Sequence, residues 1–204
     1  MKIVGLTGSI GMGKSVAAAM LQQMGIPVFD SDRSAHEFLS PNGAAFEQVA
    51  LEFPECWDKK KHIIDRKKLG QIIFNDPWQR QKLESIVHPL VWWKQKEFLK
   101  AAKSRGSKIA VLDIPLLFET GAEKKCDAVL CVDAPYFIQR QRVLGRPDMN
   151  EDKFYAILSQ QMPQIEKLQR ADIIIKTGLG RADTYRQLKT AVSQIIKIRK
   201  VRKA

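Results

Sequence analysis

Gly8-Ser9-Ile10-Gly11-Met12-Gly13-Lys14-Ser15 reads G-x-x-x-x-G-K-S, the pattern of a phosphate-binding loop. The apolar residues 3–7 come directly before it, and a helix-forming run, 16–24, follows. In such a loop successive backbone N–H groups point at a triphosphate, and the positive end of the following helix adds to the attraction. The alternative is a chance glycine-rich turn between a strand and a helix. Because all eight positions and both flanks fit, we expect a nucleotide-binding loop.

The loop provides distinct groups for the nucleotide. Lys14 can reach the β- and γ-phosphates, and the Ser15 hydroxyl can ligate Mg²⁺. The residues expected to bind the nucleotide are Gly8, Gly11, Met12, Gly13, Lys14, Ser15 and Val16. The motif therefore predicts that a nucleoside triphosphate binds, but the class of reaction must come from its surroundings.

The composition favours one domain. The chain has 204 residues, of which 45% are hydrophobic, enough for a sizeable core. A strand is expected from residue 2 onward, so we expect no signal peptide, and no apolar run approaches the ~20 residues that span a bilayer. Cys56, Cys126 and Cys131 are odd in number and lack C-x-x-C spacing, which predicts reduced core thiols in a cytoplasmic protein without a membrane partner.

The net charge of +12 suggests polyanionic partners. Much of the excess lies at residues 197–203, where cations also complement a helix C-terminus, and residues 59–61 are expected to form a solvated loop. We expect small polyanionic substrates and no nucleic-acid partner. The alternative is a basic, ATP-dependent module that binds nucleic acid. The oligomeric state stays open.

Short apolar runs alternate with longer helical patterns, which is typical of a parallel sheet covered by helices on both faces. Strands are predicted at 2–7, 27–29, 108–112, 128–132 and 172–175. Helices are predicted at 14–24, 31–39, 42–52, 66–74, 76–103, 135–145, 150–161, 163–170 and 181–201. The fold class predicted is α/β, with a P-loop nucleoside-kinase-like, parallel five-stranded sheet flanked by helices.

Two stretches are longer than a crossover between parallel strands requires. We expect residues 31–104 to form a helical insertion that binds the acceptor, and residues 138–169 to form a small lid. The core then comprises residues 1–30, 105–137 and 170–204. The insertion is rich in large apolar side chains that either shelter a substrate or only pack helices together. These are Phe38, Leu39, Phe53, Trp57, Phe74, Trp78, Trp92, Trp93 and Phe98.

Acidic residues follow two of the predicted strands. Ligands of an open parallel sheet bind outside the carboxyl ends of its strands, so Asp30 and Asp32 would project toward the γ-phosphate. A carboxylate there can accept the proton of an attacking hydroxyl, and we assign this role to Asp32, whereas one of the pair is expected to cap a helix. Asp113 ends a run that resembles a Walker B strand, which predicts a metal ligand; a strand-terminating turn residue is the alternative.

Three arginines, Arg140, Arg142 and Arg146, follow the fourth predicted strand. Arg142 and Arg146 are four residues apart and would share a helix face, from which they could stabilise a transferring phosphoryl group. The alternative is solvated surface arginines. No N-K-x-D segment and no L-S-G-G-Q-like stretch is present in the sequence, which counts against a GTPase switch and a transporter ATPase. A small-molecule kinase remains.

Several segments together resemble the dephospho-CoA kinase family. They are residues 5–15, Asp30-Ser31-Asp32, His88-Pro89, Asp113-Ile114-Pro115-Leu116-Leu117-Phe118-Glu119, the spacing Gln139…Arg142…Arg146, and Arg170-Ala171-Asp172. The first is shared by all P-loop proteins. The D-x-P-L-L-F-E run and the R-A-D entry to the last strand are much more particular to this family.

The resemblance implies ATP-dependent phosphorylation of the ribose 3′-hydroxyl of dephospho-coenzyme A, with Mg²⁺ as helper. It implies that Asp32 is the base, that Lys14 and the loop amides hold the triphosphate, and that Arg142 and Arg146 belong to a phosphate-clamping lid. The insertion would receive the acceptor. Met12 and Ser9 stand where the family more often has smaller residues, and His36 stands where an arginine is expected, which puts one acceptor contact in doubt.

Overall fold

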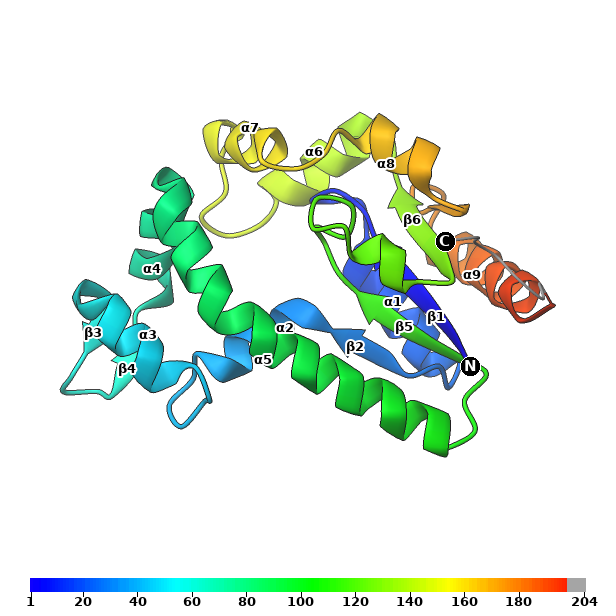
Figure 1. The fold of residues 1–204 in the computed structure, drawn as a ribbon. Helices are drawn as coiled ribbons and strands as arrows, with labels where there is room; N and C mark the ends of the chain where they lie inside the picture. The colour runs from blue at the N-terminus through cyan, green and yellow to red at the C-terminus, as the bar shows by residue number, and fades with distance from the viewer. Residues whose placement is uncertain (198–204) are drawn as a thin grey trace. The chain divides into compact units, whose positions relative to one another are not determined.

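The computed structural model describes residues 1–197 (Figure 1). Most of the basic stretch singled out in the sequence, from residue 198 on, lies outside the described residues. The chain forms two compact units. The first comprises residues 1–29 and the chain from Ala102 onward, and the second comprises residues 30–101, close to the range predicted for the insertion.

A five-stranded parallel sheet forms the centre of the first unit, as predicted. The strand order is β2 (Val28–Asp30), β5 (Ile109–Asp113), β1 (Lys2–Thr7), β6 (Ala128–Asp133) and β7 (Ile173–Lys176). The central strand β1 pairs in parallel with β5 and β6, and β6 pairs in parallel with β7. Every strand predicted from the sequence is present, with its ends within one residue. The runs are nearly continuous in apolar residues because the three central strands are buried on both faces.

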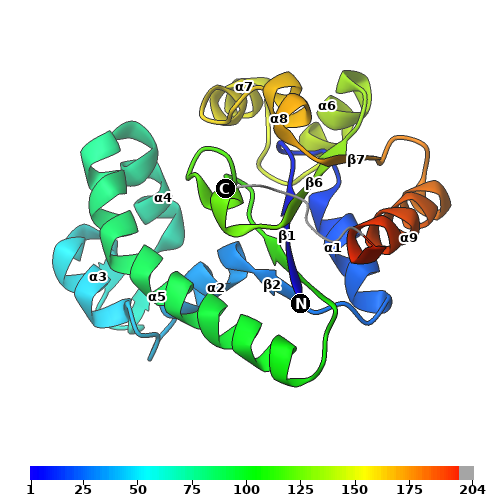
Figure 2. The ribbon, with the colours of Figure 1, turned by 45° about the vertical axis from the view of Figure 1, so that its right-hand side comes forward.

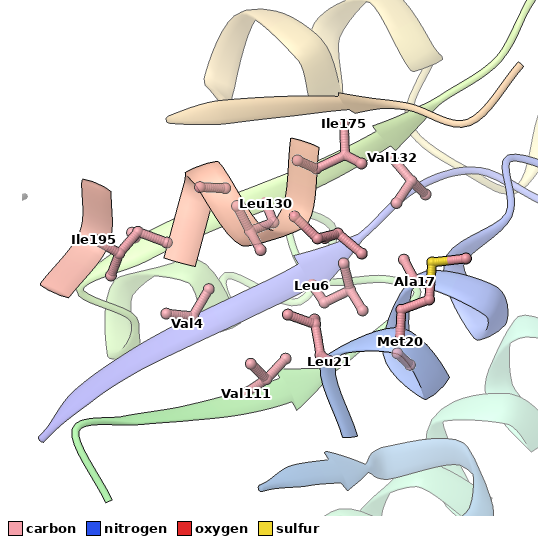
Figure 3. Close-up of a cluster of buried hydrophobic side chains, with 14 of the residues drawn as sticks. Val4, Leu6, Ala17, Met20, Leu21, Val111, Leu130, Val132, Ile175 and Ile195 are labelled. Carbon is pink, nitrogen blue, oxygen red and sulfur yellow. The ribbon is translucent and has the colours of Figure 1, made fainter. Parts of the chain in front are cut away.

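Helices α1 (Lys14–Gln23) and α9 (Arg181–Lys197) cover one face of this sheet (Figure 2). Figure 3 shows the buried cluster that they share with the strands, including Leu6, Leu21 and Ile195, each 1% exposed or less. Burying one such aliphatic side chain contributes roughly 1.5–3 kcal/mol. This packing fixes the start of α1, and therefore the phosphate-binding loop, against the carboxyl end of β1.

The remaining helices of the first unit lie after β5 or between β6 and β7. They are the short 3₁₀ helix η2 (Ala122–Lys125), α6 (Tyr136–Leu144), α7 (Glu151–Ser159) and α8 (Gln164–Arg170). All helices predicted in this unit are present, and α9 is described as far as Lys197. Within residues 1–197, no helix is long and apolar enough to cross a membrane.

The second unit is mostly helical. It contains α2 (Ser31–Phe38), α3 (Phe46–Glu52), the 3₁₀ helix η1 (Pro54–Cys56), α4 (Arg66–Asn75) and most of α5 (Pro77–Ser104). Two two-residue strands, β3 (Trp57–Asp58) and β4 (Ile63–Ile64), form an antiparallel hairpin that the sequence did not predict, because such short strands leave no periodic signal. Residues 59–62 connect them and are exposed, as expected for a solvated loop at 59–61.

Helix α3 begins four residues later than predicted. Asn42 has a φ of 67°, which lies in the left-handed region and cannot continue a right-handed helix. The helix was predicted to start at residue 42 because hydrophobic periodicity carries no information on a single backbone torsion. The helix therefore starts at Phe46, whose side chain is 1% exposed.

Seven of the nine large apolar side chains singled out in the second unit fall into two groups, and Trp57 and Phe98 are half-buried. Phe38, Leu39 and Phe53 are buried and pack the helices together. Phe74, Trp78, Trp92 and Trp93 are exposed, with Trp78 at 64%. The packing interpretation thus holds for the first group.

The cysteines match the expectation of unpaired core thiols. Cys56, Cys126 and Cys131 are free and buried. Burial raises the pKa of the Cys131 thiol to about 12 and raises that of Cys56 as well.

Candidate active site

The phosphate-binding loop lies between β1 and α1, where the motif predicted it. Gly13 precedes the helix with a φ of 91°, and Gly11 has a φ of 79°. A Cβ atom added at Gly11 would lie 2.6 Å from Val143, and one at Gly13 would lie 2.9 Å from the Thr177 hydroxyl. Both glycines are therefore required by conformation and by close packing.

Helix α1 begins at Lys14, so the N–H groups of its first turn lack partners within the helix. Ser15 and Val16 belong to this turn and are exposed. Its first turn contains no acidic residue. This end of α1 therefore carries the partial positive charge that attracts phosphate oxygens.

The lysine of the loop forms an ion pair with the aspartate at the end of β5. Lys14 Nζ lies 2.6 Å from Asp113 Oδ1, and the two side chains are 16% and 4% exposed. The register of the sheet aligns Asp113 with Leu6 of β1, which brings the carboxylate beside the loop. Asp113 thus lies beside the loop and pairs with its lysine, and its role as a metal ligand stays a prediction.

Arg142 of α6 binds the loop and the segment after β7. Its guanidinium donates hydrogen bonds to the Thr177 hydroxyl (2.9 Å), the Thr177 carbonyl (2.8 Å) and the Gly11 carbonyl (3.3 Å). The Thr177 hydroxyl in turn donates to the Met12 carbonyl at 2.8 Å. The planar fork of arginine suits three such acceptors. Arg142 therefore holds the Gly11 carbonyl directly and the Met12 carbonyl through Thr177.

The other arginines of this set are in different surroundings. Helix α6 ends at Leu144, so Arg146 lies in the turn that follows, is exposed, and does not share a helix face with Arg142. The expectation of a shared face was wrong, because Gly145 ends the helix and Pro147 follows closely. Arg140 forms an ion pair with Glu151 of α7, which raises the pKa of the arginine.

Met12 has a structural role that the motif could not show. Its side chain is 3% exposed and belongs to the buried cluster of the first unit, and its sulfur accepts a hydrogen bond from the Ala134 N–H at 3.2 Å. Met12, for which the resemblance led us to expect a smaller residue, therefore packs into the core.

Sequence reasoning missed the glutamines around the loop. Gln139, Gln161 and Gln164 all hydrogen-bond to the backbone of Ser9 or Ile10. Gln139 was quoted only for its spacing, and the abundance of glutamine in this region was the one available signal. A glutamine in a sequence does not reveal which distant backbone group it binds.

The two aspartates after β2 differ in role. Asp30 caps α2, and its Oδ1 accepts a hydrogen bond from the Arg33 N–H at 2.9 Å. This confirms that one member of the pair is a helix cap. Asp32 lies exposed in the first turn of α2, within the second unit. Its role as the base stays a prediction.

Comparison with known proteins gives the family. The sequence model of the dephospho-CoA kinase family matches residues 2–182. This chain belongs to the dephospho-CoA kinase family. The dephospho-CoA kinase of Bartonella quintana is 45% identical over 197 residues, which cover 97% of this chain and 100% of that protein. That of Mesorhizobium japonicum is 47% identical over 180 residues, 88% of this chain and 89% of the relative.

Solved structures agree with this family and fold. The crystal structure of TT1252 from Thermus thermophilus has a TM-score of 0.82 and 33% sequence identity, covering 95% of this chain and 96% of that one. Dephospho-CoA kinase from Campylobacter jejuni has a TM-score of 0.69 and 29% identity, covering 96% of this chain and 97% of that one. Membership of a kinase family implies ATP as the phosphoryl donor.

The residues around the phosphate-binding loop include oxygen ligands that suit a magnesium ion. Within residues 1–197, no three His, Cys, Asp or Glu side chains gather in a metal-binding group. Mg²⁺ commonly uses only one or two protein ligands and completes its shell with water and substrate phosphates. The Ser15 hydroxyl at the start of α1 and the Asp113 carboxylate are donors of this kind. The donor chemistry therefore fits the ion.

Proposed function

We propose that this protein transfers the γ-phosphoryl group of ATP to the ribose 3′-hydroxyl of dephospho-coenzyme A, which yields ADP and coenzyme A. Family membership supports the acceptor. The observation that carries the proposal is the phosphate-binding loop at the end of β1, with Lys14 held by the buried Asp113.

The donor would be bound by the loop and the first turn of α1. The N–H groups between Gly11 and Val16 would face the phosphate oxygens, and Lys14 would move its ammonium group toward the β- and γ-phosphates. Asp113 holds Lys14 close to this position before the nucleotide arrives. Such prior placement reduces the cost of ordering the site when the substrate binds.

The acceptor would be activated by Asp32. In the proposed step the 3′-oxygen attacks the γ-phosphorus, the bond from that phosphorus to the β–γ bridging oxygen breaks, and the hydroxyl proton goes to the Asp32 carboxylate. The exposed position of Asp32 in the first turn of α2 leaves its carboxylate accessible to a substrate hydroxyl. The second unit would provide the surface that receives the acceptor.

Ser15 and Asp113 would hold Mg²⁺, which neutralises negative charge on the β- and γ-phosphates when it is bound. Arg142 and Arg146 would contribute positive charge that stabilises the transferring group. For Arg142 this adds to its contacts with Gly11 and Thr177, which already direct its guanidinium to the loop. Both substrates are small anions, so the positive net charge needs no nucleic-acid partner.

The test is a panel of acceptors. ADP release is measured with dephospho-coenzyme A, with other nucleosides and nucleotides, and with no acceptor. We expect dephospho-coenzyme A to stimulate turnover far more than any other compound. If another nucleotide were preferred, the fold assignment would stand and the acceptor would be wrong. Tight binding to duplex DNA with a steep salt dependence would favour the nucleic-acid alternative.

A further inference from the structure

Three polar residues at the start of α8 are not used by the proposed reaction. Gln161, Gln164 and Lys167 are spaced by three residues, and Gln164 is the first residue of the helix. All three side chains bind segments that lie far away in the sequence. Two of these segments are the phosphate-binding loop and the stretch that follows Asp113.

Ile10 is held by two glutamines at once. Its N–H donates to Gln161 Oε1 at 3.0 Å, and its carbonyl accepts from Gln139 Nε2 at 2.8 Å. Gln139 is 4% exposed. Side-chain amides thus satisfy both backbone polar groups of a residue in the middle of the loop, where no regular secondary structure provides partners.

Gln164 fixes the preceding residue. Its Oε1 accepts from the Ser9 N–H at 3.2 Å, while its Nε2 donates to the Val132 carbonyl (2.9 Å) and to Asp133 Oδ1 (3.1 Å). The side chain therefore ties the loop to the carboxyl end of β6. Both ends of the amide are used, so neither an acid nor an aliphatic residue could replace it without loss.

Lys167 anchors the same segment to the stretch that follows β5. Its side chain is completely buried, and its Nζ lies 2.8 Å from Glu119 Oε1 and 3.3 Å from the Pro115 carbonyl. The same carboxylate oxygen accepts from the Met162 N–H at 2.8 Å. A buried ammonium group is tolerated only with such partners, so this contact holds the approach to α8 in one position.

We propose that Gln161 and Gln164 are positioning residues for nucleotide binding. They hold the peptide groups of Ser9 and Ile10, and this keeps the following N–H groups, from Gly11 to Val16, arranged for the phosphates before the nucleotide arrives. The inference rests on the proposed function only in requiring that the loop binds a nucleotide. The range predicted as a lid, 138–169, therefore includes residues that shape the loop itself.

The first experiment is a calorimetric titration of the full chain with ADP in the presence of Mg²⁺. Gln161→Ala loses one neutral hydrogen bond that orders the loop, so its Kd for ADP should be about fivefold higher than that of the unsubstituted protein. Gln164→Ala loses the bonds to Ser9, Val132 and Asp133 and a longer contact of Nε2 with the Cys131 sulfur, and we expect about tenfold or more. The matched control is Gln169→Ala, an exposed glutamine of the same helix, which should bind ADP within about twofold of the unsubstituted protein.

The second experiment measures hydrogen exchange of the Ser9 and Ile10 amides by NMR. Gln161 uses only its oxygen in the contact with Ile10, so Gln161→Glu should keep the Ile10 amide protected, whereas Gln161→Ala should speed its exchange about fivefold. Gln164→Glu loses its donor and turns a carboxylate toward Asp133, so it should expose Ser9 as much as Gln164→Ala does. A purely packing role predicts the same response to Glu at both positions, because Gln and Glu have the same shape.

The proposal is overturned if folded Gln161→Ala binds ADP as tightly as the control. It is also overturned if Gln161→Glu and Gln164→Glu change the exchange of the Ile10 and Ser9 amides in the same way. If the Gln164 variants fail to fold, the comparison of Gln161→Ala with Gln161→Glu alone tests the proposal. Neither experiment uses dephospho-coenzyme A, so a failed acceptor panel and a failed positioning role give different results.

Discussion

The surroundings of the phosphate-binding loop and the second unit are built in different ways. Around the loop, buried polar side chains such as Gln139, Asp113 and Lys167 bind backbone groups or opposite charges. The second unit buries an apolar set, including Phe46 and Phe53, and exposes Trp78 and Trp93. The loop region is thus specified by directional hydrogen bonds, whereas the insertion depends mainly on non-directional apolar packing.

This difference has a functional meaning. A triphosphate is bound by N–H groups that must be placed before it arrives, and a polar network provides that precision. The proposed base, Asp32, is instead exposed on the first turn of a short helix. We therefore expect substitutions at the loop to affect nucleotide binding and substitutions at Asp32 to affect turnover alone.

The largest effect is expected for Asp32→Asn. Removing the proton acceptor should lower kcat roughly 10²- to 10⁴-fold while leaving the Kd of ADP unchanged. Asp30→Asn is the matched control, because asparagine also caps helices and should keep nearly normal turnover. Steady-state kinetics with dephospho-coenzyme A and calorimetry with ADP make the measurement. Near-normal turnover of Asp32→Asn would exclude Asp32 as the base.

Asp113→Asn should have the next largest effect. It leaves the largely buried Lys14 without its negative partner and removes a proposed Mg²⁺ ligand. We expect turnover to fall roughly 10²-fold, and we expect a higher Mg²⁺ concentration to be needed for the half-maximal rate. A Mg²⁺ titration of the rate makes the check. An unchanged Mg²⁺ dependence would restrict Asp113 to holding Lys14.

Arg142→Lys should weaken nucleotide binding moderately. A lysine cannot reproduce the fork that reaches the Thr177 carbonyl, the Thr177 hydroxyl and Gly11 together, so we expect the KM for ATP to rise roughly tenfold. Arg140→Lys is the control, because its exposed ion pair with Glu151 contributes little. Equal KM values for the two variants would show that the bonds of Arg142 to the loop are unimportant for binding.

The smallest effect is expected from thiol alkylation. The raised pKa values of Cys56 and Cys131 keep both thiols protonated near pH 8, and Cys126 is buried, so iodoacetamide should leave activity unchanged. A higher pKa means that the reactive thiolate forms only at higher pH. Because the pKa of Cys131 is about 12, Cys131 should resist labelling even well above pH 8, which mass spectrometry of the native protein can follow. Labelling of Cys131 near pH 8 would contradict this prediction.

Much of the fold was evident from the sequence. The G-x-x-x-x-G-K-S motif placed the loop, and five apolar runs placed the strands to within one residue. The β3–β4 hairpin was missed because two-residue strands have no period, and α3 was predicted to start too early because the left-handed torsion of Asn42 leaves no trace in hydrophobicity. Arg146 was assigned to a helix face because its distance from Arg142 matched one turn, although α6 ends before it.

The sequence by itself determined the phosphate-binding loop, the helix after it, the capping role of one aspartate, and the family. Those signals are local, since they depend on residue type and spacing within a few turns. Only the tertiary structure decided that Asp113 holds Lys14 and that Gln161 and Gln164 hold Ile10 and Ser9. These partners are about 100 to 155 residues apart, and a hydrogen bond between them exists only once the parallel sheet has brought its strand ends together.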